Sequence, residues 1–269
     1  MHDYWLKQTK DKPLYPNMLW SQPENKLLAG KLTIIGGNVH AFAGPAEAYQ
    51  SALDAGVGAT RVLLPDSLHK VLGRFIDSGE YTPSTPSGSF ARLALDNLLE
   101  ASSWADATLI CGDLGHNSET AILLESYATK YPGQLTITGD AINYVLTEPK
   151  PYTDRQNTLL IVDTQQLQKL GTALHFPMAF TSTMDLLPLI EALHDLTETY
   201  GLQLIVRHFN TLIVSANQQI CTLPESARTA KWAVRIASYA SVWWLQNPQK
   251  TFEALTTAIF VASSADKSN

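Results

Sequence analysis

Residues 31–65, KLTIIGGNVHAFAGPAEAYQSALDAGVGATRVLLP, contain a complete strand, helix and strand. A short β-branched run at 32–35 ends at Gly36, and a helix follows in which Pro45 occupies a first-turn position where its missing N–H loses no hydrogen bond. Glycines end this helix before a second apolar run at 60–64. Two strands joined by a helix form a βαβ unit, so the stretch predicts a parallel sheet.

The first turn, GGN at 36–38, has two interpretations. A strand that passes into a helix through glycines points backbone N–H groups at one spot, which suits an anion or a phosphate. Glycine is equally the default residue of any tight turn. The stretch has neither the GxGxxG spacing nor a Walker lysine, so it is neither a Rossmann nor a P-loop motif.

Composition limits the class of protein. The chain has 269 residues, 45% of them hydrophobic, which is enough for one large α/β domain. We expect an irregular N-terminal arm at 1–30, a single domain at 31–263 and a polar tail at 264–269. The net charge of −6 argues against sequence-independent nucleic-acid binding, which requires clustered Lys and Arg.

The sequence also indicates a cellular compartment. Cys111 and Cys221 are the only cysteines and lack metal-ligand spacing, so neither a disulfide framework nor a metal site is expected. We find no signal peptide and no apolar run of membrane-spanning length. These observations predict a cytoplasmic protein without a membrane partner.

Further along the chain, apolar runs alternate with helical patterns. Strands are predicted at 108–111, 135–138, 158–162 and 202–206, followed by a hairpin at 211–215 and 220–223. The segment 78–89 is predicted to be a loop, and a long helix is predicted from about 182 to 200. The strands that end before GDLGHN and GDAIN carry polar or glycine turns at their carboxyl ends. In an open α/β sheet such turns converge on one crevice.

Three motifs in order resemble the NAD(P)H-hydrate dehydratase family of ribokinase-like proteins. They are IIGGN with AGPAEAYQSALDAGVGATRVLLP, then LICGDLGHNSET, then ITGDAIN, and they match the order of that family's GGS-x-x-Y-x-GA loop, GPGLG turn and DAD-x-LN turn. Each motif alone is weak, whereas three in order are more specific. The resemblance spans about residues 31–262. It implies a ribokinase-like α/β fold, a three-layer sandwich with a mostly parallel central sheet, helices on both faces and a late antiparallel hairpin.

The resemblance also implies a function. The family uses ADP or ATP with Mg²⁺ to dehydrate damaged NADH or NADPH, a lyase reaction of nucleotide metabolite repair, and its members are often homo-oligomers. No metal site made by the protein alone is expected. Carried over position by position, the nucleotide-binding candidates are Gly36, Gly37, Asn38 and Gly44 in the first loop, Asp113 and Gly115 in the second, Asp140 and Asn143 in the third, Arg207 in place of a lysine, and Thr211.

The residues that would carry the family's chemistry are not found. Its GTGD segment supplies an anion hole and a basic aspartate, but here 224–246 reads PESARTAKWAVRIASYASVWWLQ, and 226–252 contains no Asp or Glu. The TPH-x-GE segment is replaced by IVDTQQ, and GPGLG by CGDLG. Losing a base or an anion hole commonly lowers a rate by about 10² to 10⁴. We therefore expect weak or lost activity, and the catalytic residue is unknown.

Several polar and aromatic side chains allow two interpretations each. Asp113 and Asp140 could face Mg²⁺ or could bond their own turns. Three loop histidines, His40, His116 and His208, could act as acid or base, or could be solvated or structural. Aromatic residues of the last helices could stack on a base, although their helical spacing is typical of a core or a subunit interface. They are Trp232, Tyr239, Trp243 and Trp244.

Two main functions follow from these observations. One is a divergent nucleotide-dependent dehydratase, and the other is a degenerate relative that binds a ligand or partner without turnover. A kinase for a small hydroxylated metabolite is a third, because it shares the fold but normally needs the same absent base.

Overall fold

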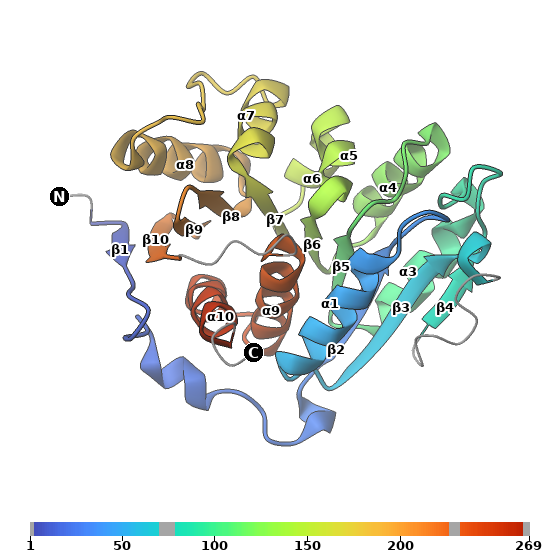
Figure 1. The fold of residues 1–269 in the computed structure, drawn as a ribbon, viewed down its shortest axis with the longest axis horizontal. Coiled ribbons are helices and arrows are strands. Elements are labelled where there is room, and N and C mark those ends of the chain that lie inside the picture. The colour runs from blue at the N-terminus through green and yellow to red at the C-terminus, as the bar shows by residue number, and fades with distance from the viewer. Residues whose placement is uncertain (1–2, 70–78, 226–231, 266–269) are drawn as a thin grey trace.

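The computed structural model describes residues 3–69, 79–225 and 232–265. Its strands form one sheet of ten members in the order β1-β10-β9-β8-β7-β6-β5-β2-β3-β4 (Figure 1). Neighbouring strands run parallel except β9, which is antiparallel to both β8 and β10. The bounds are β1 (Trp5–Lys7), β2 (Lys31–Gly36), β3 (Ala59–Pro65), β4 (Gly79–Thr82), β5 (Ala107–Cys111), β6 (Gln134–Thr138), β7 (Thr158–Asp163), β8 (Gln203–His208), β9 (Thr211–Ala216) and β10 (Gln219–Pro224).

Helices cover both faces of this sheet (Figure 1). One face packs against α1 (Ala43–Asp54), α9 (Trp232–Gln246) and α10 (Thr251–Ala265). The other packs against α3 (Leu95–Trp104), α4 (Ser118–Lys130), α5 (Ile142–Thr147), α6 (Lys150–Thr153), α7 (Thr164–Ala173) and α8 (Leu186–Tyr200). Short 3-10 turns complete the connections: η1 (Pro16–Trp20), η2 (Lys26–Leu28), η3 (Asp66–Leu68), η4 (Arg92–Ala94) and η5 (Gly139–Ala141).

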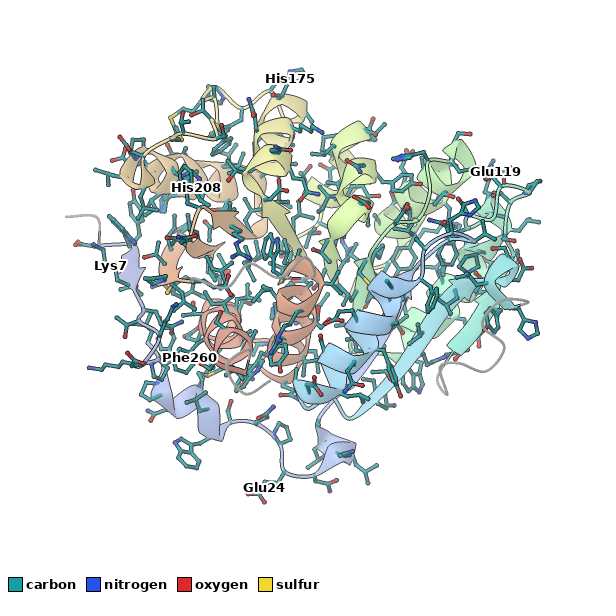
Figure 2. All side chains as sticks on the ribbon, viewed as in Figure 1. Lys7, Glu24, Glu119, His175, His208 and Phe260 are labelled. Carbon is teal, nitrogen blue, oxygen red and sulfur yellow. The ribbon has the colours of Figure 1, made fainter. Side chains whose placement is uncertain are left out.

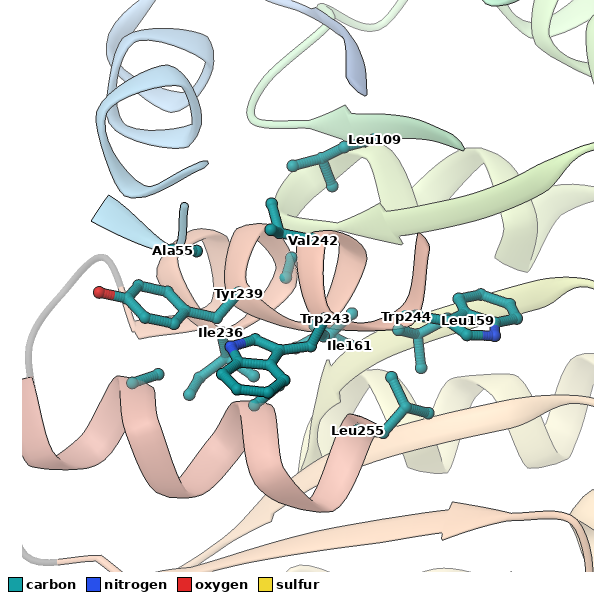
Figure 3. Close-up of a cluster of buried hydrophobic side chains, with 14 of the residues drawn as sticks. Ala55, Leu109, Leu159, Ile161, Ile236, Tyr239, Val242, Trp243, Trp244 and Leu255 are labelled. Atoms are coloured by element: carbon teal, nitrogen blue, oxygen red, sulfur yellow. The ribbon is translucent and has the colours of Figure 1, made fainter. Parts of the chain in front are cut away.

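Large aromatic side chains fill the face under α9 and α10. Trp243 and Trp244 are almost fully buried, and Figure 3 shows them among the apolar side chains of the sheet and of α10. The indole N–H of Trp244 donates to Thr251 Oγ1 at 3.1 Å, and Ser241 Oγ donates to Thr136 Oγ1 at 2.9 Å. These aromatic residues are therefore core residues, the simpler of their two interpretations.

The alternation of strands and helices predicted from sequence is confirmed, including the hairpin. The central strands are buried on both faces, which explains their nearly continuous apolar sequences. In the part of the chain that the structure describes, no helix is long and apolar enough to cross a membrane.

Two segments predicted to be irregular each contain a short strand. In the arm, Trp5–Lys7 forms β1 beside β10, and the Trp5 indole N–H donates to Thr222 Oγ1 at 3.2 Å. In the loop predicted at 78–89, Gly79–Thr82 forms β4, where Glu80 accepts two hydrogen bonds from Arg61 at 2.5 and 2.6 Å. Both are short edge strands made by long-range pairing, which a local pattern does not reveal.

Helix ends also differ from the predicted bounds. Helix α8 begins at Leu186, four residues later than about 182, with Asp185 in an extended conformation before it. Helix α10 continues to Ala265, two residues into the predicted tail, and 266–269 lie outside the described residues.

Candidate functional site at the carboxyl edge of the sheet

The loops after β2, β5 and β6 pack backbone against backbone. A Cβ on Gly36 would lie 2.2 Å from the carbonyl oxygen of Cys111, and one on Gly44 would lie 2.7 Å from the Cα of Gly112. Gly139 completes the set, since its Cβ would lie 3.3 Å from the amide nitrogen of Gly112. The predicted convergence of three turns is thus confirmed. We call this surface the glycine-loop half of the edge.

The glycines themselves have a structural explanation. Gly112 and Gly139 have φ values of +78° and +70°, which L side chains rarely adopt. At the closest contacts in this half the missing Cβ faces neighbouring protein atoms, so close loop packing alone requires glycine there. Binding of a ligand by Gly36, Gly37, Gly44 and Gly115 stays a prediction.

Asn38 ties the first loop to the second. Its side chain is 3% exposed, its Nδ2 donates to the carbonyl of Asp113 at 3.0 Å, and its Oδ1 accepts from the amide of His40 at 2.8 Å. Both ends of the amide therefore support loop structure.

The two predicted carboxylates differ in environment. Asp113 Oδ1 accepts from the amide of Gly115 at 2.7 Å, which is the turn interpretation, and the Tyr144 hydroxyl donates to the carbonyl of Gly115. Asp140 is exposed at the start of η5, and Asn143 is half-buried in the first turn of α5. Among the described residues no group of three or more His, Cys, Asp or Glu could hold a metal ion.

The polar residues at the carboxyl end of β7 also bond to their own backbone. Asp163 caps α7: its Oδ1 accepts from the amide of Gln166 at 2.8 Å, and Gln166 Oε1 accepts from the amide of Asp163 at 3.2 Å. Gln166 Nε2 donates to the carbonyl of Gly139 at 3.0 Å. This capping box fixes the β7 end against the third loop.

At the other half of the edge the contacts are ionic. Arg207, near the end of β8, lies with Nη2 3.5 Å from Oε2 of Glu225, just after β10, and their side chains are 7% and 8% exposed. Ser263 Oγ donates to Glu225 Oε1 at 3.1 Å, and the Trp232 ring lies 5.2 Å from the Arg207 guanidinium carbon. Thr211 is half-buried and pairs with His208 across the hairpin. We call this surface the ion-pair half.

Glu225 is a buried carboxylate that sequence reasoning missed. It directly precedes the stretch at 226–252 that lacks Asp and Glu, and 226–231 lie outside the described residues. The only feature of the sequence that could have pointed to Glu225 is its position directly after a predicted strand, next to Pro224. The motif comparison did not assign a role to that position.

The three predicted histidines do not meet at one point. His208 is buried, with Nε2 donating to the carbonyl of Met184 at 2.8 Å and Nδ1 3.4 Å from Thr164 Oγ1, so it is structural (labelled in Figure 2). His40 and His116 are exposed at the glycine-loop half, and β7, β6 and β5 separate β8 from β2. A shared acid–base site is therefore not formed.

A polar pocket of about 900 Å³ lies beside the glycine-loop half. The Ser84 hydroxyl donates to the Asp66 carboxylate, Ser67 Oγ donates to the carbonyl of Gly88 at 2.9 Å, and the rings of His69 and Tyr81 meet edge to face at 4.7 Å. None of the described lining residues is Lys or Arg, so the pocket does not favour an anion. The β2–β4 pocket is lined by Val39, His40, Asp66, Ser67, His69, Tyr81 and Ser84 to Gly88.

The Cys111 thiol at the end of β5 is not a nucleophile at neutral pH. Burial raises the pKa of Cys111 to about 12, and burial also raises the pKa of Cys221 to about 12. Both thiols are therefore protonated under ordinary conditions.

Comparison with solved structures identifies the architecture. The chain superposes on a ribokinase-like superfamily protein from Enterococcus faecalis with a TM-score of 0.76 at 16% identity, covering 100% of this chain and 89% of that one. The fold is ribokinase-like. An ADP/ATP-dependent NAD(P)H-hydrate dehydratase from Bacillus subtilis, co-crystallised with ATP and Mg²⁺, matches with a TM-score of 0.62 at 8% identity, over 95% of this chain and 88% of that one.

Kinases of small metabolites share this fold. The pyridoxal kinase from Staphylococcus aureus, in complex with AMP-PCP and pyridoxal, matches with a TM-score of 0.54 at 12% identity, over 85% of this chain and 84% of that one. No protein-family model matches the chain, and no curated protein matches its sequence. At these sequence identities the similarity establishes the fold alone, so function has to be argued from the residues of the site.

Proposed function

We propose that this protein binds ADP or ATP with Mg²⁺ over the glycine-loop half, and that any dehydratase turnover is weak or lost. The observation that carries the proposal is the packing of three glycine loops into one backbone surface at the carboxyl ends of parallel strands, where open α/β sheets receive their ligands. The similar B. subtilis dehydratase, which was crystallised with ATP and Mg²⁺, supports the same ligand class.

The residues present fit such a ligand in part. Asp140 places an exposed carboxylate at this edge, and carboxylate oxygens are the ligands that Mg²⁺ accepts beside phosphate oxygens. The Arg207 cation, in contrast, is held by Glu225. Of the carboxylates described near this edge, Asp113 and Asp163 bond to backbone amides and Glu225 is ion-paired, so none of these three is placed as a general base. Binding is therefore better supported than turnover.

Thermal unfolding with millimolar ADP or ATP and Mg²⁺ tests this proposal. A ligand at about 100 times its Kd adds roughly 2.7 kcal/mol to the free energy of unfolding, which gives a clear rise in Tm. Adenosine and Mg²⁺ alone serve as ligand controls. We expect Asp140→Asn to lose the part of the rise that depends on Mg²⁺, whereas Asp154→Asn, an exposed carboxylate elsewhere, keeps it. No rise with either nucleotide would reject the proposal.

Hydrated NADH is the next substrate to assay if nucleotide binds. Because none of Asp113, Asp163 and Glu225 is placed as a base, we expect turnover at least about 10²-fold below that of an intact dehydratase. Turnover comparable with an intact dehydratase would show that the activity survives.

The β2–β4 pocket favours a second candidate, a small-metabolite kinase or binder. Its hydroxyls and the Asp66 carboxylate suit a neutral or cationic hydroxylated molecule. Pyridoxal is a usable probe: under this candidate it raises Tm for the wild type and for Asp96→Asn, an exposed control, and the rise shrinks in Asp66→Asn. Phosphorylation of pyridoxal by ATP would then separate a kinase from a binder.

A further inference from the structure

The Arg207–Glu225 ion pair lies at the same edge as the proposed nucleotide site. Strands β8 and β10 both run parallel to β2, β5 and β6, since the chain reverses direction once between β8 and β9 and again between β9 and β10. Arg207 and Glu225 therefore lie at the carboxyl edge, beside the start of α9 and the end of α10. A ligand that extends along this edge from the glycine-loop half would meet this pair next.

The pair is enclosed by protein. Both side chains are more than nine-tenths buried, Trp232 covers the guanidinium, and Ser263 holds the second carboxylate oxygen. Charges at this depth interact more strongly and are screened by salt less than charges at a surface. Glu225 consequently neutralises the positive charge that a phosphate would otherwise find at the end of β8.

We propose that Glu225 acts as an internal anion that occupies Arg207 and excludes phosphate groups from the ion-pair half. A phosphate that approached Arg207 would also approach the Glu225 carboxylate, and two anions repel each other at this distance. The end of a ligand received here is therefore neutral or cationic, and Glu225 is a specificity-determining residue. The inference rests on the proposed function only in assuming that ligands enter along this edge.

Glu225→Gln tests the inference with inorganic pyrophosphate as the probe. The amide keeps the size of the side chain and can still accept the hydrogen bond from Ser263, but it removes the negative charge that lies 3.5 Å from the Arg207 guanidinium. We expect the Kd for pyrophosphate to fall at least 10-fold relative to the wild type. Thermal titrations and calorimetry both measure this change.

Two control variants separate charge from packing. Glu24→Gln makes the same charge change at an exposed position (labelled in Figure 2), and Ser263→Ala removes the hydrogen bond to Glu225 without changing charge. Both are expected to bind pyrophosphate as the wild type does. A folded Glu225→Gln protein with an unchanged Kd would overturn the inference and leave the pair a purely structural contact.

The outcome does not depend on the nucleotide test. If the wild type does not bind ADP or ATP while Glu225→Gln gains pyrophosphate binding, the inference stands and the proposed function is rejected. If the wild type binds ADP or ATP while Glu225→Gln gains no pyrophosphate binding, the proposed function stands and the inference is rejected. If Glu225→Gln does not fold, Glu225→Leu is measured, which also removes the negative charge and fills its place with an apolar side chain of similar size. A gain of at least 3-fold in that variant supports the inference, and an unchanged Kd rejects it.

Discussion

The two halves of the carboxyl edge hold their loops in place by different physical means. In the glycine-loop half, backbone atoms touch directly, and Asn38 and Asp113 bond to neighbouring amides and carbonyls. In the ion-pair half, two opposite charges meet in a buried setting. The first half depends on the absence of side-chain atoms, and the second depends on the charge state of two side chains. Substitutions should therefore affect each half in a different way.

Breaking the ion pair should have the largest effect. Arg207→Met removes the cation that lies 3.5 Å from the buried Glu225 carboxylate, and breaking a buried pair in this way costs about 3–5 kcal/mol of unfolding free energy. The double variant Arg207→Met/Glu225→Gln removes both charges and should recover most of that loss. Urea denaturation measures both values, with the exposed Arg92→Met as the control. A single variant within about 1 kcal/mol of wild type would contradict a buried-charge role.

Adding one methyl group to the glycine-loop half comes next. In Gly36→Ala the new Cβ would lie 2.2 Å from the backbone carbonyl oxygen of Cys111, so the two loops must shift and we expect the unfolding free energy to fall by about 3 kcal/mol. Gly201→Ala is the matched comparison, because Gly201 has a φ of +63° with nothing within 4 Å. It should lose only about 1 kcal/mol, the penalty for a left-handed residue. Equal losses in the two variants would show that close packing is not what matters at position 36.

Asn38→Ala should have a smaller effect. Two part-buried hydrogen bonds are lost, each worth about 1 kcal/mol, so the unfolding free energy falls by about 2 kcal/mol. Asn25 caps η2 at an exposed position, and Asn25→Ala should lose less than about 1 kcal/mol. Hydrogen exchange at the amides of His40 and Gly115 would show whether the loops loosen; unchanged exchange would mean that the glycines alone hold them.

The smallest expected effect is a pH dependence of stability that comes from two buried cysteines, one at the end of β5 in the glycine-loop half and one in β10, the strand before Glu225. Burial raises the pKa of Cys111 and of Cys221 from 9.0 to about 12. The folded state therefore keeps protons that the unfolded state releases, and this contribution, complete below about pH 9, is lost as pH rises toward 12. Between pH 7 and pH 10 the unfolding free energy of the wild type should therefore fall, and in each of Cys111→Ala and Cys221→Ala it should fall by about 1 kcal/mol less. Urea denaturation at the two pH values measures this difference. Identical pH dependence in all three proteins would contradict this account.

Much of the fold was accessible from the sequence. Eight of the ten strands are apolar runs bounded by turn residues, so their positions along the chain and the late hairpin followed from local patterns. The edge strands β1 and β4 did not follow, because each is held by pairing with a distant or charged partner. Glu80, for example, reads as a loop residue until Arg61 is placed opposite it.

The site was predictable only where backbone geometry decides it. Glycines at the carboxyl ends of neighbouring strands predicted that the following loops pack together, and the structure confirms this. Whether a polar side chain faces a ligand or its own backbone depends on distances of a few tenths of an ångström, which no spacing reveals. For that reason the sequence did not reveal that Asp113 and His208 bond to the backbone. It also did not reveal Glu225, whose role depends on the position of Arg207 in the folded chain.

Strand β1 imposes an order on the synthesis and folding of this chain. Trp5 hydrogen-bonds to Thr222, 217 positions later. At roughly 5–20 residues per second, the ribosome takes on the order of 10 to 40 seconds to supply that partner. During this interval the apolar side chains of the arm have no strand to pair with, so the edge of the sheet is closed only after nearly the whole chain has emerged.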